Sequence, residues 1–472
     1  MQKRSHRVLG VLMVLAIFLG LLAGCAPAPA AAPAAGEAEA PTAEASAEEM
    51  SGEAVTLTVA TVNNPDMQVM ESLTEEFEAA YPSISLEWVV LPENELRGRV
   101  TTDTATGAGS FDVVTVGTFE VPIWGGNGWI ESIDALMADN ADHVQADYDI
   151  DDLLPAIRSG LSNEGELYAL PFYGESSFTM YNKRMFDEAG LEMSEQPTWE
   201  QIQEFACQLH DPENDQYGIV LRGLPGWGQV MAPLTTVVNT YGGDWFDMEW
   251  MPQLDSPEWN EAVTFYATLM QECGAPGVSG IGFTEALALM SQGQAAMWVD
   301  ATVAAGFLAG SDAGEDISHA LAPVGPVAKG NGWLWAWSLA IPSTSEHKAE
   351  ALQFISWATS KDYIELVAIV HGWAGVPPGT RVSTYERQEY LDAAPFAELT
   401  LKSMLNADPT DSTRDPVPYT GVQFVAIPEF QGIGTDVSQF IADALAGNIT
   451  VEEALEKGQQ LTLEAMEDAG YR

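Results

Sequence analysis

The sequence predicts an α/β protein built of two lobes or more, with an N-terminal segment that precedes the folded body. Three observations carry this prediction. Strand-like and helix-like patterns alternate between residues 55 and 117, residues 54–472 are too many for one ordinary core, and residues 1–53 lack the pattern of a packed domain.

The first residues have the pattern of a signal peptide. Three basic residues precede an uncharged apolar run over residues 8–23, which ends at Leu22-Ala23-Gly24-Cys25. The run is short for a spanning helix of roughly 20 residues, so a retained transmembrane helix is disfavoured. The four-residue motif resembles the lipobox of bacterial lipoproteins, which implies cleavage after residue 24 and acylation of Cys25. An ordinary secretory signal with a chance cysteine is the alternative.

Residues 25–53 are expected to form a flexible tether. After Cys25 they are mostly Ala, Pro, Glu and Ser, and such a segment cannot bury enough apolar surface to offset the entropy of an ordered chain. We therefore expect the folded body to begin at about residue 54.

The chain is strongly acidic. Its formal net charge is −51, and removal of residues 1–24, which hold three Lys or Arg and no acid, would take it to −54. Nucleic acid is therefore disfavoured as a partner. The acids are spread along the chain, which favours a solvated surface; a saline or acidic habitat would select the same composition.

After Cys25 only Cys207 and Cys273 remain. Both lie in helix-like segments, so neither a disulfide framework nor the spacing of a metal site is present, and no cofactor or metal is expected. The sequence leaves two alternatives open: a disulfide between these cysteines, or two buried free thiols.

Residues 55–117 have the pattern βαβαβ. The strands are expected over residues 55–62, 84–91 and 111–117, and the last is a nearly continuous apolar run typical of a buried parallel strand. The helices are expected over residues 65–80 and 93–106.

Helices dominate the rest of the chain. Thr198-Trp199-Glu200-Gln201 has the pattern of a capping box and is expected to open a helix that ends near Leu209. Further helices are expected over residues 257–272, 284–292, 348–359, 436–447 and 451–469.

Several motifs together resemble family 1 extracellular solute-binding proteins, the group that contains maltose-binding protein. These motifs are Tyr181-Asn182-Lys183, Ala189-Gly190-Leu191, Pro197-Thr198-Trp199-Glu200 and Gly293-Gln294-Ala295-Ala296-Met297-Trp298. Longer segments resemble the mannitol/sorbitol-binding branch more narrowly. They are residues 173–181, 221–228, 239–245, 297–302 and 333–337.

The resemblance implies a two-lobed periplasmic-binding-protein fold, in which hinge closure encloses the ligand in a cleft between the lobes. One lobe would comprise residues 54–172 and 325–360. The other would comprise residues 173–324 and 361–472.

Binding of a polyol or sugar needs planar hydrogen-bonding groups and indoles that stack on the carbon skeleton. Trp333, Trp335 and Trp337 recur at period two, which places them on one face of a strand, either in the core or toward the cleft. Arg222 precedes a Gly-Leu-Pro-Gly-Trp loop, so it can donate forked hydrogen bonds while Trp227 supplies a stacking wall. A surface ion pair is the alternative for Arg222.

Acidic and amide side chains follow the expected strands. Glu175 lies where the chain would change lobes, two residues after Tyr173, and Asp300 ends an apolar run, so both would lie beyond strand ends where ligands bind. Structural hydrogen bonding is the alternative for both acids. Other polar residues could either contact the ligand or cap a loop. They are Asn63, Asn64, Asn94, Glu120 and, as the weakest candidate, Arg381.

The sequence therefore predicts a binding protein and not an enzyme. It is expected to be a monomeric, lipid-anchored component of an ABC importer on the outer face of the cytoplasmic membrane, periplasmic or extracellular. It would pass a mannitol- or sorbitol-like polyol, or a mono- or oligosaccharide, to the transmembrane subunits of a permease. A secreted glycosidase that uses Glu175 and Asp300, with carboxyls roughly 5–10 Å apart, is a remote alternative. A carbohydrate-sensing lipoprotein is another.

Overall fold

The computed structural model describes residues 54–330 and 332–472. The expected signal peptide (1–24), the acylated Cys25 and the tether (25–53) lie outside the described residues. Within the described part of the chain, no helix combines the length and the apolar composition that crossing a bilayer requires.

The first lobe is organised around a five-stranded sheet, with strand order β2-β1-β3-β10-β6. β1 runs parallel to β2 and β3, whereas β10 runs antiparallel to β3 and β6. The carboxyl ends of β1, β2, β3 and β6 therefore meet the amino end of β10 at one edge of the sheet. The strands are β1 (Val55–Val62), β2 (Ile84–Leu91), β3 (Val113–Gly117), β6 (Leu170–Glu175) and β10 (Trp335–Ala340).

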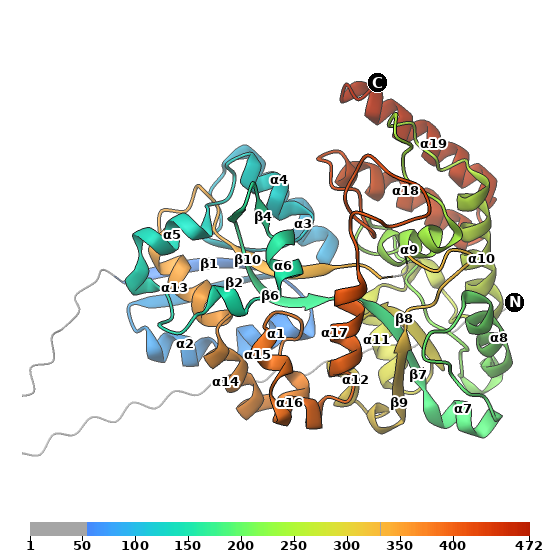
Figure 1. Cartoon of the computed structure of the whole chain (residues 1–472), viewed down its shortest axis with the longest axis horizontal. Helices are drawn as coiled ribbons and strands as arrows, with labels where there is room; N and C mark the ends of the chain where they lie inside the picture. The colour runs from blue at the N-terminus through green and yellow to red at the C-terminus, as the bar shows by residue number, and fades with distance from the viewer. Residues whose placement is uncertain (1–53, 331) are drawn as a thin grey trace, which may run out of the picture. The chain divides into compact units, whose positions relative to one another are not determined.

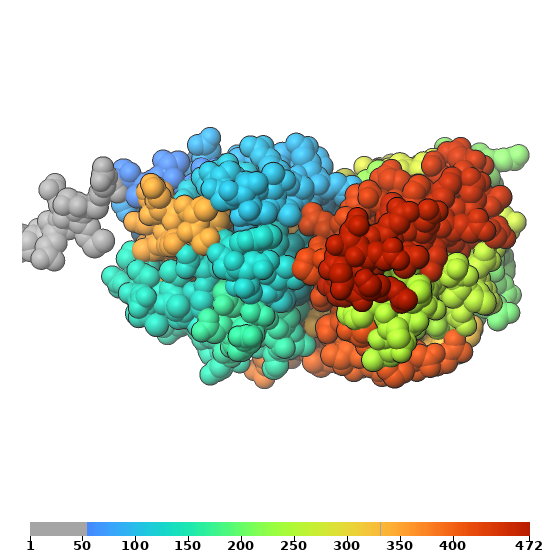
Figure 2. Space-filling view, turned by 90° about the horizontal axis from the view of Figure 1, so that it is seen from above, coloured from blue at the N-terminus to red at the C-terminus, as the bar shows by residue number. Residues whose placement is uncertain are grey.

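Helices of the first lobe come from the N-terminal third of the chain and from one later segment. Figures 1 and 2 show this later helix, α13, in orange among the blue and teal elements of the N-terminal third. The helices are α1 (Pro65–Ser72), α2 (Thr74–Ala80), α3 (Glu93–Thr106), α4 (Glu120–Gly126), α5 (Ile133–Asp139), α6 (Pro155–Gly160) and α13 (Lys348–Ala358).

The second lobe is organised around a three-stranded antiparallel sheet, with strand order β8-β7-β9. Its strands are β7 (Ser177–Asn182), β8 (Met297–Ala301) and β9 (Ile317–Leu321). Its helices are α7 (Lys183–Ala189), α8 (Trp199–Leu209), α9 (Met231–Tyr241), α10 (Pro257–Cys273), α11 (Phe283–Ser291), α12 (Ala304–Ala309), α17 (Ala397–Asn406), α18 (Phe430–Leu445) and α19 (Val451–Asp468).

The chain passes between the two sheets where β6 ends and β7 begins. Ser176 lies at this crossing, and its N–H donates to Thr302 Oγ1 at 3.1 Å while its carbonyl accepts from the Thr302 N–H at 2.8 Å. Because Thr302 directly follows β8, these two bonds fix the crossing to the end of the second sheet.

Three helices directly follow α13, and two of them, α15 and α16, contact α17 of the second lobe, whereas other residues of this segment contact the first lobe. Tyr363 in α14 packs against Phe172 in β6, with ring centroids 5.6 Å apart, and Arg381 pairs with Leu153 of the first lobe. The predicted lobe boundaries, 54–172 with 325–360 and 173–324 with 361–472, therefore remain a prediction. The helices are α14 (Lys361–His371), α15 (Val382–Tyr385) and α16 (Gln388–Ala393).

Local sequence signals explain most element boundaries. β1, β2 and α3 have the bounds that the sequence predicts, and β3 is buried at every position, as a central parallel strand should be. The capping box that opens α8 is confirmed, because the Thr198 hydroxyl accepts from Gln201 N–H and the Gln201 side chain accepts from Thr198 N–H.

The helix predicted over residues 65–80 is wrong in one respect, since it is divided into α1 and α2 at Leu73. The hydroxyl of Ser72 donates to Val69 O, and that of Thr74 donates to Glu71 O. Such local bonds compete with the helical ladder, which explains the break.

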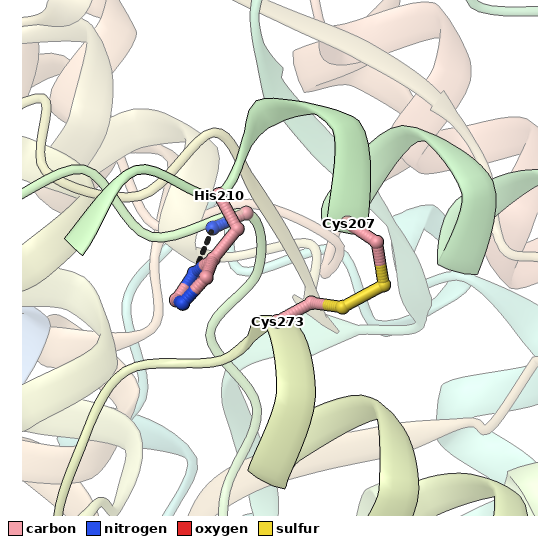
Figure 3. Close-up of a disulfide and its surroundings, with 4 residues drawn as sticks. Cys207, His210 and Cys273 are labelled. Carbon is pink, nitrogen blue, oxygen red and sulfur yellow. Dashed lines mark hydrogen bonds between the residues drawn. A yellow bond between two sulfur atoms is a disulfide. The ribbon is translucent and has the colours of Figure 1, made fainter.

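Cys207 in α8 and Cys273 in α10 form a disulfide, with their Cα atoms 4.9 Å apart (Figure 3). The bond links two helices, and its two cysteines are 66 residues apart in the sequence. Close to it, the Gly218 N–H donates to His210 Nδ1. Of the two alternatives left open by the sequence, the structure thus has the bridge.

Candidate functional site

A cavity of about 320 Å³ lies at the edge where the strand ends of the first lobe face the second lobe. It is lined by residues from both lobes. The lining residues are Val62, Asn63, Asn64, Pro92, Glu93, Asn94, Arg97, Tyr173, Glu175, Arg222, Leu224, Trp227, Gly228, Gln229, Ala232, Gly282, Phe283, Thr284, Glu285, Ala301, Val303, Trp333, Trp335, Trp337 and Gln423.

The strand ends place the polar lining residues. Asn64 directly follows β1 and is the N-cap of α1, since its Oδ1 accepts from the Met67 N–H at 3.0 Å. Its Nδ2 donates to the Tyr173 hydroxyl at 3.0 Å, near the end of β6. One asparagine therefore orients both the helix and a tyrosine at the cavity wall.

Arg222 and Asp300 form a buried, two-pronged ion pair. Arg222 Nε donates to Asp300 Oδ2 at 2.8 Å, and Nη2 donates to Oδ1 at 2.5 Å. Asp300 is fully buried and also accepts from Trp298 Nε1 at 3.0 Å and from the Ala301 N–H at 2.6 Å. Arg222 lines the cavity and Asp300 does not, so Asp300 acts by holding the guanidinium in place.

The third donor group of Arg222, Nη1, binds the Gly228 carbonyl at 2.9 Å. Burial by itself acts to lower the pKa of the guanidinium, but Asp300 and its acidic neighbours outweigh it and raise that pKa. Arg222 therefore stays charged, with N–H groups left over from these three bonds, since a guanidinium has five.

Glu175 lines the cavity with a carboxyl that has no hydrogen-bond partner among the described residues. The residue is only 7% exposed. Burial raises the pKa of this carboxyl well above its ordinary value of 4.5, although Arg222 acts in the opposite direction and Asp300 adds to the rise. Glu175 is therefore a buried polar group at the cavity with hydrogen-bonding capacity that the described protein residues leave unused.

Four indoles lie at the cavity wall. β10 begins at Trp335, so Trp333 precedes the strand, but Trp333, Trp335 and Trp337 all line the cavity as the period-two pattern allowed. Trp227 comes from the loop before α9 and packs edge-on against Trp335, with ring centroids 5.9 Å apart. The wall is thus apolar and aromatic between charged groups, which is the combination that the sequence analysis expects of a site for a polyol or sugar.

Arg97 in α3 is a cavity residue that sequence reasoning missed. Its guanidinium carbon lies 4.1 Å from the ring centroid of Trp227, 4.5 Å from that of Trp337 and 5.0 Å from that of Trp335. The missed signal was spacing, because a residue three positions after Asn94 lies on the same helix face.

The described residues contain no group of three or more His, Cys, Asp or Glu side chains arranged to hold a metal ion.

Residues 62–365 match the family of bacterial extracellular solute-binding proteins. The chain belongs to this family. A mannitol-binding protein of Pseudomonas aeruginosa is 49% identical to this solute-binding protein over 421 residues, which is 89% of this chain and 94% of the relative.

Solved structures agree with this assignment. An ABC transporter solute-binding protein of Agrobacterium vitis S4 with bound D-mannitol has a TM-score of 0.86 and 51% identity, and covers 88% of this chain and 99% of its own. A second one, from Agrobacterium radiobacter K84 in complex with ribitol, has a TM-score of 0.76 and 25% identity, with coverages of 87% and 98%. The predicted two-lobed α/β fold of periplasmic solute-binding proteins is thereby confirmed.

Eight of the predicted ligand-binding side chains line the cavity of this solute-binding protein. They are Asn64, Asn94, Tyr173, Glu175, Arg222, Trp227, Trp335 and Trp337. Asn63 and Trp333, which the sequence analysis also named as candidates, line it as well.

Glu120 does not line the cavity. Its Oε1 accepts from Arg97 Nη1 at 2.5 Å and its Oε2 accepts from the Gly117 N–H at 3.1 Å. Glu120 therefore acts through Arg97, as Asp300 acts through Arg222.

Arg381 also lies away from the cavity of the solute-binding protein. It is fully buried, and its Nε and Nη2 donate to the Thr359 carbonyl at 3.2 and 3.1 Å. Its Nη1 donates to the Asp149 carbonyl at 3.2 Å and faces the Asp152 carboxylate at 3.3 Å. All of these bonds join α15 to the first lobe, so the structure gives Arg381 a packing role.

Proposed function

We propose that this solute-binding protein serves an ABC importer by binding a hexitol such as mannitol in the cavity described above. One observation carries the proposal: this chain is 51% identical, over 88% of its length, to a protein solved with bound D-mannitol. The cavity chemistry supports it, because indoles, guanidinium N–H groups and an unpartnered carboxyl suit a neutral, hydroxyl-rich molecule.

The cavity size favours a small ligand. A volume of about 320 Å³ lies at the lower end of the roughly 300–1,000 Å³ range of ligand pockets, which suits a molecule of the size of a hexitol better than an oligosaccharide.

We further propose that Cys25 is acylated and that the protein, as a monomer, hands its ligand to the transmembrane subunits of a permease. A tether of residues 25–53 would keep it near the permease and raise its effective concentration there. Substitution Cys25→Ser should then release the protein from membranes, which cell fractionation measures. Recovery of the variant in the membrane fraction at the wild-type level would refute the anchor.

The ligand is tested by thermal shift and calorimetry on protein that begins after residue 25. D-Mannitol, D-sorbitol, ribitol, glucose and maltose form the panel, since a ligand of the native state raises the unfolding midpoint. A shift with the hexitols and none with maltose supports the proposal. A shift with glucose or maltose alone would keep the binding role and refute the polyol assignment.

A further inference from the structure

Arg97 is held in one position from several sides. Three indoles surround its guanidinium at 4.1 to 5.0 Å, and its residue exposure is 7%. Its Nε donates to Glu93 Oε1 at 3.1 Å, and its Nη1 donates to Glu120 Oε1 at 2.5 Å. Such a cation, paired and caged by aromatic faces, has little freedom to adopt another rotamer.

The three indoles and two carboxylates around Arg97 determine which of its N–H groups are available to a ligand. Trp335 and Trp337 come from the first lobe and Trp227 from the second, and the guanidinium lies at their faces. A guanidinium has five N–H groups, and those of Arg97 that donate to Glu93 and Glu120 are the Nε–H and one N–H of Nη1, while Nη2 lies 3.1 Å from Glu93 Oε1 in the ion pair. The remaining N–H groups belong to a residue that lines the cavity.

Neighbours of Arg97 on α3 also bind the loop that carries Trp227. Asn94 Nδ2 donates to the Pro225 carbonyl at 3.0 Å, and Glu93 Oε2 accepts from Gln229 Nε2 at 3.0 Å. We call α3 residues 93–97 and loop residues 225–229 the clasp, because these contacts join the two lobes beside the cavity.

Two glycines allow the close approach of the clasp segments. A Cβ atom on Gly228 would lie 2.3 Å from Glu93 Oε1 and 3.1 Å from Arg97 Nε. A Cβ atom on Gly226 would lie 2.6 Å from Asn94 Oδ1, and the positive φ of 144° at Gly226 also favours glycine. A side chain at Gly228 would therefore displace the Glu93 carboxylate, and one at Gly226 would displace the Asn94 amide and strain the backbone.

We propose that Arg97 is a ligand-binding residue that also closes the clasp, so that one guanidinium joins the ligand, the first lobe and Trp227 of the second lobe. The ligand part of this inference rests on the proposed function. Occupancy and closure are coupled because a ligand bound to the free N–H groups of Arg97 stabilises the same rotamer that Trp227 packs against.

The variants separate a role in the clasp from a general effect of charge. Arg97→Met removes the donors and the cation, and Arg97→Lys keeps the charge but removes the planar group. Arg99→Met is the matched control, because Arg99 lies two residues along the same helix, is exposed, and has its guanidinium over Phe111 at 5.5 Å. Circular dichroism and thermal unfolding verify that each variant folds.

Two measurements give the outcome. Calorimetry with D-mannitol should show binding to Arg97→Met at least about 30-fold weaker than to Arg99→Met, with Arg97→Lys between them, as loss of charge-assisted bonds predicts. Stopped-flow tryptophan fluorescence should show that faster dissociation accounts for most of the loss. Equal affinity of Arg97→Met and Arg99→Met would overturn the ligand role.

Hydrogen exchange on the ligand-free protein tests the clasp without any ligand. Arg97→Met should raise amide exchange in residues 225–230 relative to both wild type and Arg99→Met. Unchanged exchange there would overturn the clasp. If wild type does not bind D-mannitol, the proposed function fails, and hydrogen exchange still decides whether the clasp exists.

Discussion

Replacement of Asp300 by asparagine tests the buried ion pair that supports Arg222. Asp300 is fully buried and accepts two hydrogen bonds from Arg222, one from Trp298 and one from the backbone of Ala301. Asparagine has one acceptor oxygen and an amide nitrogen that only donates. Asp300→Asn therefore leaves the Arg222 guanidinium buried, charged and facing a donor.

The expected loss of stability is large for a change of one atom. Removal of one partner from a buried ion pair costs about 3–5 kcal/mol, because the remaining charge is uncompensated. Binding should fall as well, since Arg222 no longer has a fixed orientation at the cavity. Loss of one charge-assisted hydrogen bond to a ligand costs roughly 2 kcal/mol, or about 30-fold in affinity.

A double variant separates the two effects. In Arg222→Met/Asp300→Asn no charge is left behind, so the free energy of unfolding should recover by at least about 2 kcal/mol relative to Asp300→Asn alone. Ligand affinity should not recover, because the guanidinium is absent. Stability should then recover in the double variant while binding stays weak.

Urea unfolding, followed by far-ultraviolet circular dichroism and tryptophan fluorescence, measures stability, and calorimetry measures binding. Lys457→Met is the control, because Lys457 forms an exposed ion pair with Glu453 at 2.9 Å and its loss should cost no more than about 0.5 kcal/mol. The reasoning is refuted if Asp300→Asn unfolds within 1 kcal/mol of wild type, on the roughly 3–5 kcal/mol scale of such pairs, or if the double variant binds like wild type.

Three further predictions concern the disulfide and two buried titratable groups. Cys207→Ala/Cys273→Ala should lower the free energy of unfolding by about 4 kcal/mol, given the 66-residue separation, and a cost under about 1 kcal/mol in urea unfolding would contradict the loop-entropy estimate. Burial lowers the pKa of His319 from its ordinary 6.5 to about 4, because its Nε2 is buried without a partner although the residue as a whole is only half-buried. Stability from this group is therefore present above pH 6.5 and lost as the pH falls toward 4, and His319→Leu should remove that part of the pH dependence of urea midpoints. Burial raises the pKa of Glu175 above its ordinary 4.5, so the stability that this group contributes is present below pH 4.5 and lost as the pH rises through the folded-state pKa. Glu175→Gln should flatten the dependence of the urea midpoint on pH in that range, and a profile identical to that of wild type would count against this reasoning.

Local patterns in the sequence predict the elements well where one local force dominates. The alternation that defines β1 and β2 and the capping box at Thr198 correspond to observed structure, since each depends on neighbours within a few residues. The helix over residues 436–447 was predicted too short, because α18 begins at Phe430 and contains Gly432 and Gly434, which weaken the helical signal. Tertiary packing outweighs that local cost.

The residues of the candidate site also divide into those that local patterns predict and those that depend on distant packing. Strand ends and a period-two tryptophan pattern indicate which residues meet at the cavity, because topology places them there. The spacing from Asn94 could have placed Arg97 at the cavity, but the indoles around its guanidinium could not be predicted, because Trp227 and Trp335 lie far along the chain. Arg381 shows the converse, because a loop arginine after prolines resembles a ligand contact and its bonds are all to the protein backbone and Asp152.

The bridge between α8 and α10 makes the finished protein depend on where it folds. Thiols of a cell interior are kept reduced by glutathione and thioredoxin, whereas bonds of this kind persist in oxidising surroundings. Before export, α8 and α10 would be held together by packing alone, and the second lobe would open more readily. After export, oxidation would lock them, so the chain is easiest to unfold while it still has to cross the membrane and hardest to unfold where it meets its ligand.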